Sequence, residues 1–165
     1  MSKTSREVIE GIKEALGPDW LPSIYRDKIR TQRTRSIKLD IAERINSAEI
    51  HYTLLGIELK VGKRRIACPD LATARYLRVF ARIGSAEVAV PYDITRISVA
   101  ADELETSWQR SMLAVDEEAG RRPAKGIAII RTKLAAAIRD ELNQIGPGDA
   151  MPAFDRETRQ RGRET

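Results

Sequence analysis

The segment that most constrains the fold is residues 49–61, Glu-Ile-His-Tyr-Thr-Leu-Leu-Gly-Ile-Glu-Leu-Lys-Val. Successive side chains of a β-strand point to opposite faces, and here both faces are largely apolar as far as Glu58. Such a pattern is typical of a central strand that is covered on both sides. The segment is therefore predicted to be one continuous strand. Glu58 and Lys60 then share one face at its carboxyl end, where an α/β sheet tends to place its site.

A second apolar alternation surrounds Asp40. Apolar residues at positions 37, 39 and 41 alternate with polar ones, which favours a strand over 36–44 that carries Asp40. Apolar residues at 37, 41 and 45 would also share one face of a helix, so a helical interpretation stays open. The turn-like pair Asn46-Ser47 and the strand-rich run that follows it favour the strand.

A hairpin is predicted directly after the first segment. Glycine in the first position of Gly62-Lys63 suits a two-residue turn. A return strand over 64–68 would then set apolar residues opposite apolar residues, which supports the register. The predicted pairs are Leu59 with Ile66 and Ile57 with Cys68.

Two helices are predicted on either side of these strands. The first covers 5–16, where Thr4 and Glu7 form a capping box. The second covers about 70–83 and begins at a capping aspartate, Asp70. A short strand at 87–90 follows it, and a helix followed by a strand suggests a crossover back into the sheet.

Two long amphipathic helices are predicted over 95–117 and 124–145. They would form an antiparallel hairpin that covers the sheet or pairs with a second subunit. We therefore expect an α/β core over 1–93, the helical hairpin over 94–146, and a disordered tail over 147–165.

Composition indicates a protein with one sizeable core. Of the 165 residues, 42% are hydrophobic, and the formal net charge of +5 suggests an anionic partner. The single cysteine, Cys68, excludes an internal disulfide and fits a reducing compartment. No apolar run approaches the roughly 20 residues that cross a bilayer, and the amino terminus does not resemble a signal peptide. A soluble, cytoplasmic protein without a membrane partner is expected.

The order of these elements resembles the PD-(D/E)xK nuclease superfamily, which includes many restriction endonucleases and archaeal Holliday-junction resolvases. The likeness covers residues 5–92: helix, three strands, helix and strand, with Asp40 on the second strand and Glu58-Leu59-Lys60 on the third. The resemblance implies an α/β fold with a mixed central sheet and flanking helices, which is a restriction-endonuclease-like core.

The resemblance also implies a metal-dependent phosphodiester cleavage. Asp40 and Glu58 would bind Mg²⁺ or Mn²⁺, with the main-chain carbonyl of Leu59 as a further ligand, and Lys60 would orient the attacking water. Many such nucleases add a glutamate from the first helix. Glu10 is the candidate, because Glu7 already has a role in the capping box.

Basic residues supply a further candidate function. They would contact the phosphates of a nucleic acid, expected to be DNA, although such runs are commonly solvated faces. The alternative is a non-catalytic basic α+β interaction module whose helical hairpin docks a protein partner or a second copy in a homodimer. The candidate phosphate contacts are Arg30, Arg33, Arg35, Lys63, Arg64 and Arg65.

Overall fold

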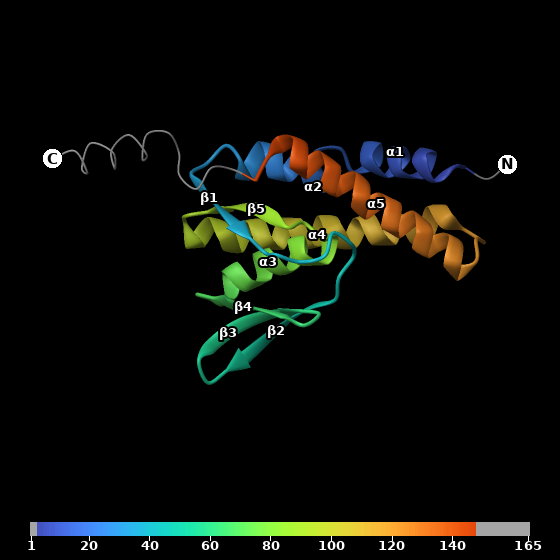
Figure 1. The fold of residues 1–165 in the computed structure, drawn as a ribbon. Helices are drawn as coiled ribbons and strands as arrows, with labels where there is room; N and C mark the ends of the chain where they lie inside the picture. Colours follow the sequence, from blue (N-terminus) through green and yellow to red (C-terminus); the bar gives the residue numbers. More distant parts are fainter. Residues whose placement is uncertain (1–2, 148–165) are drawn as a thin grey trace.

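The computed structural model describes residues 3–147, which fold as a helical body that carries two small antiparallel sheets (Figure 1). The mixed α and β composition expected from the sequence is confirmed. The elements, in chain order, are α1 (Ser5–Leu16), the 3-10 turn η1 (Gly17–Asp19), α2 (Leu21–Ile24), the π-helical turn η2 (Tyr25–Ile29), β1 (Thr34–Lys38), β2 (Ala48–Thr53), β3 (Gly56–Val61), β4 (Arg64–Cys68), α3 (Leu71–Ile83), β5 (Glu87–Pro91), α4 (Ile94–Ala119) and α5 (Ala124–Ile145).

The helical body is built from α1, α3, α4 and α5, which share one apolar core. The predicted capping box begins α1, where Thr4 Oγ1 accepts a hydrogen bond from the backbone N–H of Glu7 at 3.1 Å. Helices α4 and α5 lie against α1, and the apolar stripes that they bury include Leu104 and Leu134. Burying one such side chain stabilises the fold by about 1.5–3 kcal/mol. These stripes are therefore used within the chain.

Strand β5 pairs with β1 on one edge and meets the helices on the other. Two tyrosine hydroxyls replace a neighbouring strand at this second edge. The backbone N–H of Ala89 donates to Tyr25 Oη at 3.1 Å, and Tyr76 Oη donates to the carbonyl of Ala89 at 2.6 Å. Tyr25 Oη in turn donates to the carbonyl of Gly146 at 2.7 Å, which ties the end of α5 to the sheet. Burial raises the pKa of both tyrosines and so keeps their hydroxyls protonated.

The other sheet has the order β2-β3-β4 and packs one face on α3. Its second hairpin is confirmed in detail, because Gly62 at the turn has a φ of +59°. The predicted cap of α3 is also confirmed, since Asp70 Oδ1 accepts from the backbone N–H of Thr73 at 2.7 Å. The register confirms the predicted pairs, Leu59 with Ile66 and Ile57 with Cys68.

The prediction of one continuous strand over 49–61 is wrong. The chain turns at Leu54-Leu55, so the segment forms two strands, β2 and β3, which pair with each other. Gly56, with a φ of +128°, provides the backbone freedom at this turn. Thr53 Oγ1 completes it by donating to the Gly56 carbonyl and accepting from the Leu55 N–H.

The prediction of a strand over 36–44 is also wrong in its extent. Strand β1 ends at Lys38, and Asp40 has a φ of +54°, which is incompatible with a strand. The buried side chain of Leu39 enters the core at this point, and the chain leaves the sheet directly after it.

The expected single mixed sheet is not observed among residues 3–147. Strand β5 returns beside β1 and not beside β2–β4, and each strand pair is antiparallel. The predicted disordered tail falls almost wholly on 148–165, outside the described residues.

Candidate functional site

The structure places Glu58 and Lys60 side by side on the outer face of β3, the face that points away from α3. Leu59 between them points inward and is fully buried. Glu58 is half-buried, and its Oε1 lies 3.5 Å from Nη1 of Arg65 on β4. The register sets His51 of β2 opposite Glu58, so that an imidazole faces the carboxylate from the neighbouring strand.

Asp40 lies apart from this pair. Its neighbour Leu39 accepts a hydrogen bond at its carbonyl from Arg64 Nε, at 3.3 Å, which places the segment beside the first residue of β4. Arg64 pairs with Val61, three residues beyond Glu58, and three strand residues span about 10 Å. Arg64 also belongs to the inner face of the sheet, whereas Glu58 belongs to the outer face. The structure therefore brings Glu58 and Lys60 together on the outer face, whereas the residue before Asp40 is hydrogen-bonded to Arg64, an inner-face residue beside the other end of β3.

Glu10 is also separate from Glu58. It is exposed on α1, which packs against α4 and α5 at the opposite side of the molecule from β2–β4 (Figure 1). Among residues 3–147, no group of three or more histidine, cysteine, aspartate or glutamate side chains is arranged to hold a metal ion.

Several of the predicted phosphate-contacting residues have partners within the chain. Arg30 Nη1 donates to Thr34 Oγ1 at 3.2 Å, and the guanidinium of Arg33 lies 4.7 Å from the ring centroid of Tyr92. Arg35, half-buried on β1, belongs to the other sheet from Lys63 and its two arginine neighbours on the β3–β4 hairpin. The six predicted side chains thus lie in two separate regions, residues 30–35 around the start of β1 and the β3–β4 hairpin.

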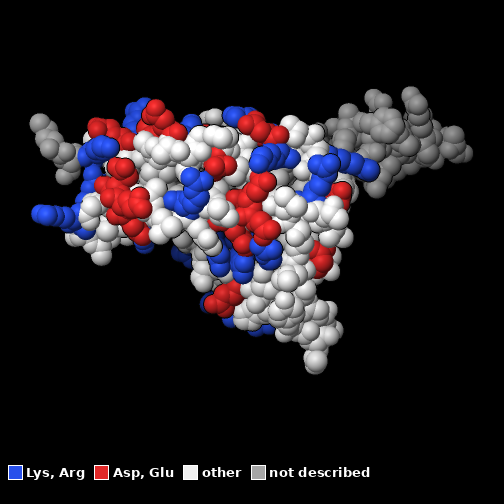
Figure 2. Space-filling view, turned by 180° about the vertical axis from the view of Figure 1, so that it is seen from behind, with Lys and Arg blue, Asp and Glu red and all other residues white. Residues whose placement is uncertain are grey.

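Arg75 and Arg78 of α3 bind Glu105 of α4 and so hold the two helices together. Glu105 accepts from Arg75 at 2.9 Å and from Arg78 at 2.6 Å. Burial alone would raise the pKa of Glu105, but these hydrogen bonds and charges outweigh it and lower the pKa below 4.5. Figure 2 shows the same mixture over the helical body on this side, where basic and acidic side chains are interspersed.

The distal end of the β2–β3 hairpin is the most apolar exposed feature of the described chain. Leu54 and Leu55 are fully exposed, at 106% and 101%, and Tyr52 is 72% exposed. We call these three residues the apolar tip. In Figure 2 the projection at the lower end of the molecule is largely free of charged side chains. Its sequence signal is Thr-Leu-Leu-Gly at 53–56, a turn whose apolar residues continue the alternation of the flanking strands.

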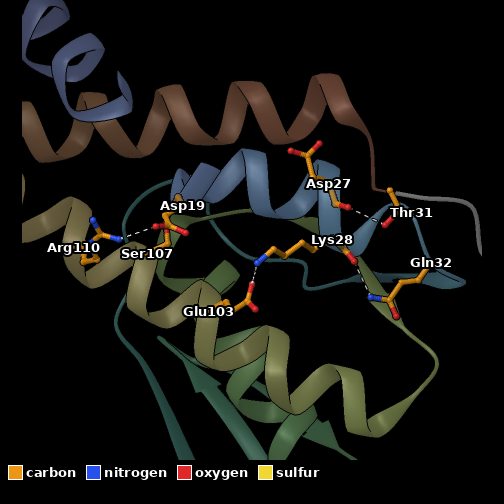
Figure 3. Close-up of polar contacts among 8 residues, drawn as sticks. All are labelled: Asp19, Asp27, Lys28, Thr31, Gln32, Glu103, Ser107 and Arg110. Atoms are coloured by element: carbon orange, nitrogen blue, oxygen red, sulfur yellow. Dashed lines mark hydrogen bonds and ion pairs between the residues drawn. The ribbon is translucent and has the colours of Figure 1, made fainter. Parts of the chain in front are cut away.

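A groove of about 730 Å³ between η2 and α4 is a second concave region. Lys28 Nζ lies 2.9 Å from Glu103 Oε2 at its wall, and Arg110 Nη1 lies 3.1 Å from Asp19 Oδ2 further along α4 (Figure 3). Ser107 Oγ donates to the backbone carbonyl of Asp19 at 2.5 Å. These contacts fasten the segment before β1 onto α4, so we assign the groove a structural role.

No protein-family model matches this chain, and no curated protein or solved structure shows significant similarity to it. None of the described helices is both long and apolar enough to span a membrane.

Proposed function

We propose that this protein is a non-catalytic interaction module that binds a protein surface through the apolar tip. The observation that carries the proposal is the complete exposure of two consecutive leucines at the end of a projecting hairpin. Single exposed leucines are ordinary, but a cluster of exposed large apolar residues marks an interaction surface. Burying both leucines against a partner would contribute about 3–6 kcal/mol.

The fold supports this role because it holds the hairpin without using its tip. The β2–β4 sheet is anchored by the inward side chains of Leu59 and Val61, which pack toward α3. The hydroxyl of Thr53 and the backbone of Gly56 hold the turn. The side chains of Leu54 and Leu55 are therefore not needed to keep its shape. Two residues that stabilise nothing in the free chain are therefore available to a partner.

A photo-crosslinking amino acid at position 54 tests the proposal directly. The full-length chain, expressed in its own host cells, is expected to yield a covalent adduct with a second polypeptide after illumination. The matched control carries the same amino acid at exposed Glu117 on α4 and is expected to yield none. Absence of an adduct at position 54 would overturn the proposal.

Metal-dependent phosphodiester cleavage is a second candidate, supported by the adjacent placement of Glu58 and Lys60 on an open sheet face. In this proposal the chain is a restriction-endonuclease-like, Mg²⁺-dependent nuclease or DNA-binding protein of the cytoplasm. Asp40 would have to reach the outer face of β3 for the predicted ligand set to form. A nicking assay on supercoiled DNA with Mg²⁺ or Mn²⁺ tests it, with Asp40→Ala, Glu58→Ala and Lys60→Ala as variants. Equal cleavage by all four proteins would reject this site.

A further inference from the structure

The β2 strand, which leads into the apolar tip, is an unpaired edge. Within residues 3–147 the sheet order is β2-β3-β4, and β2 pairs with β3 alone. Because Thr53 and Gly56 close the hairpin, the backbone groups of Ile50 and Tyr52 point away from β3. The same alternation directs the carbonyl of Ala48 outward, where Arg82 Nη2 donates to it at 3.4 Å. An edge of this kind is a template for a further strand.

We infer that the partner of the apolar tip is a second copy of this chain, paired antiparallel through β2 about a two-fold axis at Ile50. This inference rests on the proposed function and names its partner. Backbone alternation allows an axis at Glu49, Ile50 or His51, because each of these sets outward backbone groups against outward groups. The side chains then choose among the three registers.

An axis at Ile50 gives complementary side chains across the interface. Glu49 then lies opposite the partner's His51, and His51 opposite the partner's Glu49. Within one chain these two side chains already interact, with His51 Nε2 3.1 Å from Glu49 Oε2, so the same contact can form across the axis. An axis at Glu49 would oppose two carboxylates, and an axis at His51 would oppose two imidazoles. The other charged side chains of this outer face are Glu58 opposite His51, Lys60 opposite Glu49, and Arg65 on β4.

The same register gives the apolar tip a place to bind. With Ile50 at the axis, the two copies of β2 pair over Ala48–Thr53, so each apolar tip comes near the residues that precede the partner's Ala48, which include Ile45, 40% exposed in the single chain. Strand pairing and apolar contact would therefore occur together, and both would be repeated by the two-fold symmetry.

The other open edges are less suited to self-pairing. The free edge of β4 begins with Arg64 and Arg65, and that of β1 carries Arg35 and Lys38, and charged residues of this kind commonly protect an edge from pairing. Strand β2 contains neither lysine nor arginine nor proline, the residues that commonly protect an edge.

Light scattering after size-exclusion chromatography of the full chain tests the inference. The wild type is expected to show twice the monomer mass of 18.5 kDa at concentrations above roughly 10 µM, as suits a small interface. Tyr52→Pro removes one outward N–H from the β2 edge together with one side chain of the apolar tip, and it leaves the β2–β3 hydrogen bonds in place, so it is expected to be monomeric. Ala67→Pro is the matched control on the β4 edge, and it is expected to remain dimeric. A monomeric wild type would overturn the inference.

Cysteine crosslinking tests the register and does not depend on the proline variants folding well. In a Cys68→Ser background, Ile50→Cys is expected to form an intermolecular disulfide under mild oxidation, because residue 50 meets its own copy at the axis. Glu49→Cys and His51→Cys are expected to crosslink at least tenfold more slowly. Faster crosslinking at 49 or 51 would overturn the proposed axis. An adduct from position 54 to a different protein, with a monomeric chain, would overturn this inference and leave the proposed function standing.

Discussion

The helical body and the β2–β4 sheet differ in how completely their polar groups and apolar side chains find partners within the chain. In the body, the free edge of β5 is closed by the hydroxyls of Tyr25 and Tyr76, and the charge of Glu105 is neutralised by two arginines. In the sheet, only the inner face is covered, and the β2 edge ends in two exposed leucines. The comparison indicates that the body is a scaffold and that the sheet carries the contacts left for a partner.

The largest effect should come from matched leucine truncations in the two regions. Leu104→Ala in α4 removes a fully buried side chain and is expected to lower the free energy of unfolding by about 2–5 kcal/mol. Leu54→Ala in the apolar tip is expected to change it by less than about 0.5 kcal/mol. Urea unfolding followed by circular dichroism measures both. A large loss for Leu54→Ala at concentrations where the chain is monomeric would show that the tip is part of the core.

A smaller effect is expected when the hydroxyl of the buried Tyr76 is removed, and the exposed Tyr52 supplies the control. Tyr76→Phe deletes the donor to the Ala89 carbonyl and leaves that buried acceptor unsatisfied, which costs about 1–3 kcal/mol. Tyr52→Phe, at the exposed hairpin, is expected to leave stability unchanged. Thermal unfolding of the two variants beside wild type compares them, and equal melting temperatures would contradict the role given to Tyr76.

The sequence predicted the local elements well because their determinants are local. The cap at Asp70 and the turn at Gly62 depend on neighbouring residues, and both formed where expected. The helical hairpin followed from the spacing of apolar residues in α4 and α5. The confirmed register between β3 and β4 followed from the two-residue turn, since that turn fixes which residues face each other.

The errors arose where the alternation could not distinguish two arrangements. A two-residue turn at Leu54-Leu55 keeps the alternating pattern of 49–61 intact, so a hairpin resembled one strand. The choice between one sheet and two depended on tertiary contacts of β5 with Tyr25 and Tyr76, which no local pattern encodes. The predicted ligand set rested on this single sheet. With two sheets, Asp40 follows β1 and Glu58 lies on β3, so their residue types are right for a metal and their placement differs.

The smallest of the three effects concerns Glu105, and its pH dependence distinguishes a paired charge from an exposed one. Because the pKa of Glu105 is lowered in the folded chain, its charge stabilises the fold fully above the ordinary value of 4.5. This contribution is lost as the pH falls through the lower folded-state pKa. Glu105→Gln is therefore expected to lower the free energy of unfolding by about 1 kcal/mol at neutral pH. The difference from wild type should disappear once the pH lies below the lowered folded-state pKa of Glu105.

Glu117→Gln is the matched control for this charge, because Glu117 is exposed on the same helix. Urea unfolding at a series of pH values should show almost no difference in the free energy of unfolding between Glu117→Gln and the wild type. If both variants followed the same curve, the network of Arg75, Arg78 and Glu105 would be a solvated surface cluster. The contrast between a body with neutralised charges and a sheet with unused contacts would then weaken, because α3, the helix that supports the sheet, would be less firmly held to α4.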